Sequence, residues 1–169
     1  MGTPWWIAPP LLFVAALLET SLFPALGFIS VRPGLVLQLV AVWSLLRGVR
    51  EGLSWGFLGG LLLDLFSGAP FGTASLALVL VAAVCGLGGA TAFRSNPFFP
   101  VVTVFWASIL YGLFFMFLLR THEVPVIWLG SLRQVVVPNA LLNTIVTPLT
   151  FWLLSRIENR TRTTVAVEW

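Results

Sequence analysis

Residues 52–72 read GLSWGFLGGLLLDLFSGAPFG, and this stretch determines how the chain is expected to fold. Gly52, Gly56 and Gly60 recur at every fourth position, and Asp64 continues the spacing by one more step. Positions four apart lie on one face of a helix, so the pattern predicts a glycine face along which a second helix can approach closely. Asp64, the only aspartate in the chain, lies on the same face and points away from lipid.

The composition of the whole chain is that of an integral membrane protein. Of its 169 residues, 59% are hydrophobic and 9% are charged, whereas about 25% of the residues in an ordinary soluble domain are charged. A bilayer core about 30 Å thick takes roughly 20 apolar residues per helix. The chain therefore has room for several spans and for no separate soluble catalytic domain.

Arginine, proline and glycine residues divide the sequence into six apolar segments, which predict an all-α polytopic membrane protein with six transmembrane helices. We expect one transmembrane domain over residues 1–155 and a short basic cytoplasmic tail over residues 156–169. The expected spans are Trp5–Phe28, Pro33–Leu46, Gly52–Phe66, Phe71–Phe93, Phe98–Leu119 and Leu132–Leu154.

The distribution of arginine predicts the orientation of these spans. If the first span starts on the inner side, six arginines lie inside and three lie outside, as the positive-inside rule requires. Both termini are therefore expected in the cytoplasm. The inner residues are Arg47, Arg50, Arg94, Arg156, Arg160 and Arg162, and the outer residues are Arg32, Arg120 and Arg133.

Three ionisable residues fall at one depth in this topology. Glu19 lies in the outer third of the first span, Arg32 opens the second span, and Asp64 closes the third span. Charges within a bilayer are costly and are generally paired. Two interpretations remain open: a buried ion cluster in which Arg32 neutralises one or both acids, or a site that contacts a ligand or a partner protein.

A second series of small residues follows in the next segment. Ala82, Gly86 and Ala90 are spaced by four and end at Arg94. A tight turn joins this segment to the glycine-bearing one, so we expect the two small-residue faces to form a close antiparallel helix pair.

The sequence offers no catalytic or metal-binding constellation. His122 is the only histidine, Cys85 is the only cysteine, and the remaining acids are scattered singly. Nucleophilic catalysis needs an adjacent base, and metal-dependent transfer needs several ligands together. We therefore expect no enzymatic activity, no cofactor and no metal. Nucleic-acid binding would need a clustered basic surface on a soluble face, which the sequence does not predict.

Over residues 31–80 the chain resembles the MreD family of rod shape-determining proteins. In the second expected span the resemblance rests on Arg32 and Pro33, and in the third on a G-x-x-G-L-x-x-D-L pattern followed by G-x-P-x-G. The residues that carry these patterns are Gly56, Gly60, Asp64, Gly68, Pro70 and Gly72. The last two expected spans carry no such motif.

The resemblance implies a non-catalytic scaffold in the bacterial inner membrane. Its implied partners are MreC and, in the wider elongation complex, RodA, a class B penicillin-binding protein and the MreB filament. The basic tail is expected to contact membrane lipids. The family also resembles in fold the S components of energy-coupling-factor transporters, so the alternative is a protein that binds a small, vitamin-like molecule. Apart from residues 121–131, the expected outer loops are short, which favours the scaffold, because such loops offer little to cover a ligand pocket.

Overall fold

The computed structural model describes residues 8–22, 33–92, 98–123 and 128–163, with side chains described up to residue 21 in the first range, residue 88 in the second and residue 158 in the last. Within these ranges the fold contains helices and turns and no strand, which confirms the all-α prediction. The elements are α1 (Ala8–Leu17), η2 (Leu18–Leu22), α3 (Leu35–Arg47), α4 (Val49–Ser67), α5 (Thr73–Ala92), α6 (Phe99–Thr121), α7 (Trp128–Ser131), η3 (Leu132–Val136) and α8 (Val137–Thr163).

The helical runs of the described residues follow the six expected apolar segments. By length and hydropathy, two of them are suited to crossing a membrane on their own: Phe99–Thr121 and Trp128–Glu158. The others are shorter or less apolar, and α3 has only 13 residues. At 1.5 Å per residue α3 extends about 20 Å, which is less than the thickness of a bilayer core. The six-span arrangement therefore stays a prediction.

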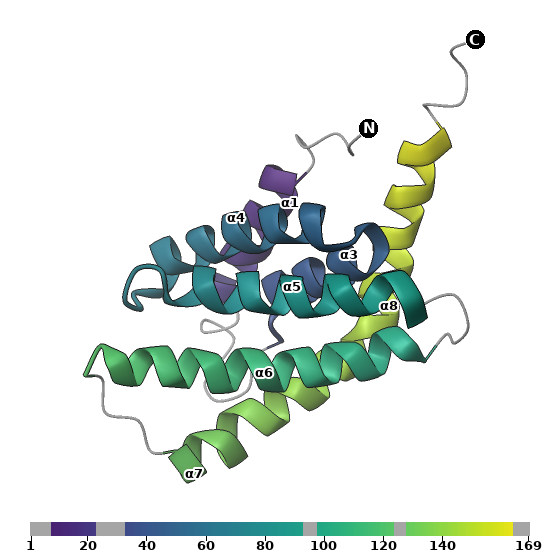
Figure 1. The fold of residues 1–169 in the computed structure, drawn as a ribbon. Helices are drawn as coiled ribbons and strands as arrows, with labels where there is room; N and C mark the ends of the chain where they lie inside the picture. Colours follow the sequence, from purple (N-terminus) through teal and green to yellow (C-terminus); the bar gives the residue numbers. More distant parts are fainter. Residues whose placement is uncertain (1–7, 23–32, 93–97, 124–127, 164–169) are drawn as a thin grey trace.

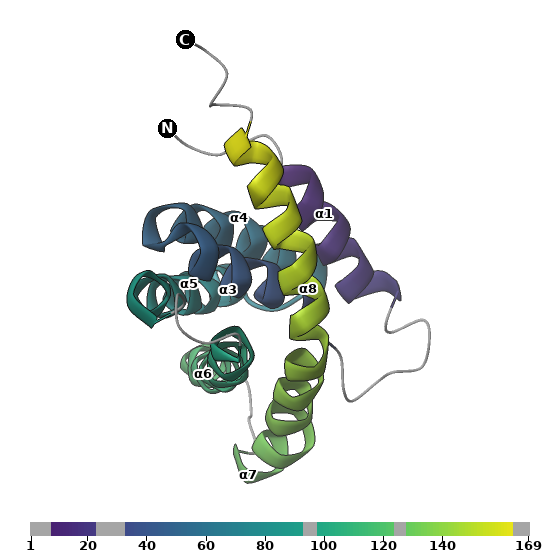
Figure 2. The same cartoon turned by 90° about the vertical axis from the view of Figure 1, so that its right-hand side faces the viewer.

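Helix α3 lies at the centre of the fold. It contacts α1, α4, α5, α6 and α8, and every residue from Val36 to Leu45 is buried. A helix that is apolar on nearly all sides is buried in a protein core or in a membrane, and here the neighbouring helices bury α3. Figure 1 shows α4, α5 and α6 running roughly side by side, and Figure 2 views this layer nearly end-on with α1 and α8 crossing beside it.

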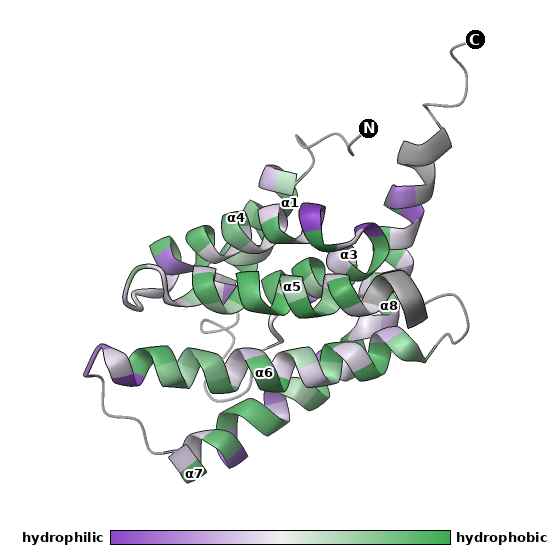
Figure 3. Cartoon of the chain, viewed as in Figure 1, coloured by the Kyte–Doolittle hydropathy of each residue, from purple (hydrophilic) through white to green (hydrophobic). Residues whose placement is uncertain are grey.

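Helix α8 has an apolar outer surface and carries polar residues on its inner side. Leu141, Ile145 and Leu149, which follow one another at every fourth position, are 52%, 74% and 66% exposed. On the other side, Asn143 and Thr147 are buried. This pattern is the reverse of a water-facing helix and is typical of a helix that faces lipid. Figure 3 shows apolar residues along most of the length of the helices, with polar residues mainly near helix ends.

Candidate functional site

Asp64 caps the start of α5. Its Oδ1 accepts a hydrogen bond from the Ala74 N–H at 2.8 Å, and its Oδ2 accepts bonds from the N–H groups of Gly72 and Ser75 at 3.0 and 3.1 Å. The Ser75 hydroxyl donates a fourth bond to Oδ2 at 2.7 Å. The first N–H groups of a helix have no partner within the helix and favour a negative charge. The buried carboxylate therefore joins α4 to α5.

The turn between these helices depends on the G-x-P-x-G residues. Gly68 ends α4 in the left-handed conformation, with φ of 69°, and Gly72 has φ of 94°. Residues with a side chain rarely adopt these angles. Between the glycines, the Pro70 carbonyl accepts bonds from the N–H and hydroxyl of Thr73. The turn thereby brings the start of α5 back to Asp64.

The glycine face of α4 lies against α5 over part of its length. A Cβ at Gly56 would be 2.8 Å from the Leu78 carbonyl oxygen, and a Cβ at Gly60 would overlap the backbone of Ser75. Gly52, by contrast, lies against Ser44 of α3. The glycine face therefore contacts two different helices.

The small residues of α5 are placed as follows. Ala82 lies opposite Gly56, and a Cβ on Gly86 would be 2.6 Å from the backbone of Val49 at the start of α4. The side chain of Ala90 lies outside the described residues. Gly59, which the sequence pattern did not single out, faces Val36 of α3.

The expected cluster of Glu19, Arg32 and Asp64 is only partly within the described structure, because Arg32 lies outside it. Glu19 lies in η2, where its Oε2 accepts a bond from the Val36 N–H at 3.1 Å, near the start of α3. Glu19 and Asp64 thus both accept hydrogen bonds from the start of a helix, Glu19 from α3 and Asp64 from α5. The pairing of either acid with Arg32 stays a hypothesis. The carbonyl of Pro33, the residue after Arg32 in the sequence, accepts a hydrogen bond from the Leu35 N–H.

A buried hydrogen-bond network, which the sequence interpretation missed, connects α3, α6 and α8. The Gln38 amide donates to the carbonyl and side-chain oxygens of Asn143 at 3.1 and 3.3 Å. Asn143 Nδ2 donates to the Ser108 hydroxyl at 3.0 Å, and its Oδ1 accepts the Gly34 N–H at 2.8 Å. The Thr150 hydroxyl donates to Gln38 Oε1 at 3.0 Å. The sequence signal was the four-residue spacing of polar residues along α8.

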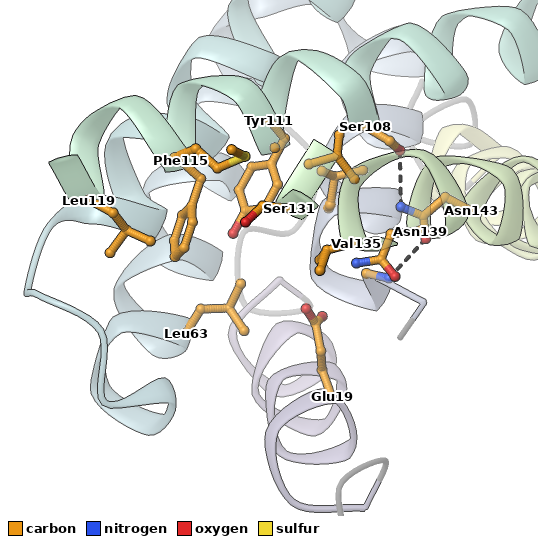
Figure 4. Close-up of a pocket in the computed structure, with 15 residues that line it drawn as sticks. Glu19, Leu63, Ser108, Tyr111, Phe115, Leu119, Ser131, Val135, Asn139 and Asn143 are labelled. Atoms are coloured by element: carbon orange, nitrogen blue, oxygen red, sulfur yellow. Dashed lines mark hydrogen bonds between the residues drawn. The ribbon is translucent and has the colours of Figure 1, made fainter. Parts of the chain in front are cut away.

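A cavity of about 420 Å³ lies beside this network. It is lined by residues of α6, the α7–η3–α8 arm, the start of α3, α4 and η2. In Figure 4, Tyr111 and Phe115 project from α6 toward a space that Glu19 approaches from the opposite side. Leu63 and Asn139 also line the cavity. Its wall is therefore largely apolar, with a few polar groups.

The opposite end of α3 has its own charged contact. Arg47 Nε lies 3.5 Å from Glu158 Oε1, which connects α3 to the last part of α8. The Arg47 guanidinium also lies 5.7 Å from the centre of the Trp43 ring, and that ring stacks on Trp55 at 4.4 Å. The ends of α3 are therefore each held by a charged side chain: Glu19 at the start and Arg47 at the end.

The family model of the rod shape-determining protein MreD matches residues 3–157 of the chain. The chain belongs to the MreD family. The resemblance inferred from the residues around Asp64 is therefore confirmed and extends over nearly the whole chain. Membership identifies a membrane protein that determines rod shape, and the family is a structural one. Comparisons with curated proteins and with solved structures gave no match.

Proposed function

We propose that the chain is a non-catalytic scaffold of the bacterial wall-elongation complex, that it resides in the inner membrane, and that it binds MreC. In this role it helps to position lateral peptidoglycan synthesis near RodA, a class B penicillin-binding protein and MreB. The observation that carries the proposal is the MreD family match over residues 3–157. The basic tail contributes contacts with anionic lipid head groups.

The bonding of the buried polar groups supports a structural role. Asp64 and Glu19 each bind the N-terminus of a helix, and Gln38 and Asn143 bind each other across two helices. A catalytic carboxylate or amide must present its functional atoms to a substrate. Here these atoms hold helices together, which gives a partner protein a fixed surface.

The test is co-purification with MreC. MreC carrying an affinity tag should retain this chain from detergent-solubilised membranes at equal expression levels, and an unrelated tagged single-span protein should not. Failure to retain the chain, when the purified chain elutes as a single folded species, would contradict the scaffold proposal.

The cavity of about 420 Å³ favours a second candidate, a transporter subunit that binds a small molecule. Small-molecule sites are generally cavities of about 300–1,000 Å³ with apolar walls and a few polar groups. This candidate predicts uptake of a labelled vitamin in cells that also express an energising module. Uptake that is unchanged by deletion of the chain, together with retention by MreC, favours the scaffold alone.

A further inference from the structure

Helix α8 contains Pro148 in its interior and changes direction near its middle. Figures 1 and 2 show the bend from two sides, and in Figure 2 helix α3 lies on its inner side. Proline has no N–H to donate to the carbonyl four residues earlier, and its ring crowds that carbonyl. Sharp bends in helices usually occur at such residues. Pro148 therefore divides α8 into two parts, and the hydrogen bond that would stiffen their junction is missing.

The two parts of α8 contact different helices. Before the proline, residues 128–147 form the α7–η3–α8 arm, in which Val136 lies against Gly112 of α6. After the proline, Glu158 lies 3.5 Å from Arg47 of α3. The arm also forms one wall of the cavity, so a rotation of the arm about Pro148 would change the width of the cavity. The lining residues that it contributes are Ser131, Val135, Val136, Asn139 and Asn143.

One buried side chain of α3 bonds α8 on both sides of Pro148. Gln38 Nε2 donates to the carbonyl and side-chain oxygens of Asn143, before the proline. Gln38 Oε1 accepts the hydroxyl of Thr150, after the proline. The Gln38 side chain is fully buried, and a buried amide that loses its partners is left with unsatisfied donors and acceptors. These bonds therefore hold the two parts of α8 at one angle.

We propose that Pro148 is a hinge and Gln38 its latch, so that release of the Gln38 bonds lets the α7–η3–α8 arm swing away from α4 and opens the cavity. The structure holds the latched state. Interhelical hydrogen bonds in membrane proteins are individually weak, so a molecule that binds better to the open state can shift the population toward it. The proposal concerns movement within one chain and does not depend on MreC binding.

Distances between pairs of spin labels measure this movement in the full chain in phosphatidylcholine nanodiscs. Each pair joins α8 or the arm to α4, and all labelled positions are exposed. The native Cys85 is fully buried and stays unlabelled. Cysteines are introduced at Leu129 with Leu65, at Leu141 with Leu65 and, as the control pair after the proline, at Leu153 with Phe57.

The first variant, Gln38→Leu, keeps the approximate size of the side chain and removes its bonds to α8. We expect one narrow distance for each arm pair in the unchanged chain and a second, longer distance in Gln38→Leu. The control pair should not change. Leu129 and Leu141 lie roughly 28 and 10 Å along the helix from the hinge, so the shift should be about three times larger at Leu129. Thr144→Val, which loses only a bond to its own helix, is the matched control and should keep one distance.

Two further variants test the latch and the hinge separately. Thr150→Val leaves the bonds to Asn143 in place and removes the bond to Gln38 Oε1, so it tests the latch if Gln38→Leu does not fold. Adding Pro148→Ala to the latch variant restores the missing N–H, and the second distance should disappear. A single unchanged distance in the folded latch variants would overturn the proposal. So would an equal shift at Leu129 and Leu141, a shift of the control pair, or a second distance that persists with Pro148→Ala.

Discussion

Asp64 shows how one side chain can connect two helices. Replacing it with alanine would leave the N–H groups of Gly72, Ala74 and Ser75 without their acceptor in a buried place. An unsatisfied buried donor costs about 1–3 kcal/mol. We expect Asp64→Ala to lower the free energy of unfolding by about 3 kcal/mol and to reduce the amount of folded protein. Ser54→Ala on the exposed side of α4 is the matched control. For both variants, thermal unfolding measures the stability, and size-exclusion chromatography measures the amount of folded protein.

The double variant Asp64→Ala, Arg32→Ala distinguishes a helix cap from an ion pair. If the carboxylate is bound only by the N–H groups at the start of α5, removing Arg32 restores no stability to the Asp64→Ala variant. If Arg32 is the principal partner, the single change leaves an unpaired buried cation, and the double change recovers part of the stability. We expect no recovery, because four donors from the turn and the start of α5 already bind the carboxylate.

The sequence placed Asp64 on the glycine face but did not show what it binds. Helical spacing determines the direction of a side chain, and that much could be read from residues 52–64. The donors come from the far side of a turn whose path depends on the left-handed angles at Gly68 and Gly72. Neither angle follows from helical periodicity, so the candidate partner was the nearest opposite charge in the expected topology.

At the scale of helices, Gly60 of α4 and Gly88 of α5 lie in different surroundings. A Cβ at Gly60 would overlap the backbone of Ser75, whereas a Cβ at Gly88 would only reach the Phe99 ring at 3.9 Å. Overpacking typically costs about 1–3 kcal/mol, and alanine in an open helix position is favoured over glycine by up to about 1 kcal/mol. We expect Gly60→Ala to lower the unfolding temperature and Gly88→Ala to leave it unchanged or raise it. A lower unfolding temperature for both variants would show that the contact at Gly60 is not special.

The hydrogen bonds of Asn143 hold α8 to α3 and α6, and their removal gives a second test between helices. Interhelical hydrogen bonds in membrane proteins average about 0.6 kcal/mol each, and Asn143 makes side-chain bonds to Gly34, Gln38 and Ser108. We expect Asn143→Ala to cost about 2 kcal/mol in unfolding experiments in mild detergent. Thr144→Val, which loses only a bond to its own helix, should change stability much less. Equal losses for the two variants would mean that the network contributes nothing beyond packing.

The network could have been suspected from the sequence but not assembled. Asn139, Asn143 and Thr147 recur every four residues along one face of α8, opposite the exposed Leu141 and Ile145. This spacing indicates a buried polar face in a membrane helix. The partners come from positions more than 30 residues away, and pairing over such distances depends on how helices cross in the folded molecule.

At the scale of the whole molecule, the enclosure of α3 shows why the length of a segment does not by itself decide whether it crosses a membrane. α3 is short, yet it is covered by five other helices and needs little contact with lipid. The hydropathy of this segment predicted an apolar helix, and the structure contains one there. Whether a helix faces lipid or protein depends on its neighbours, which hydropathy along a single segment does not specify.

The six-span, inward-termini topology predicts the location of every connection. A phosphatase fused after Trp169 should be inactive and a fluorescent protein at the same position bright, because positive loops stay on the cytoplasmic side. Cysteines at Ser67 and Glu123, both exposed, should react with an impermeant thiol reagent from outside. The native Cys85 is fully buried and provides an unreactive background. Active phosphatase with a dark fluorescent protein would reverse the orientation. A third outcome is that the fusions place the C-terminus in the cytoplasm but neither cysteine is labelled. The turns at Ser67 and Glu123 would then not reach the outer surface, and the chain would cross the membrane fewer than six times, with an even number of crossings.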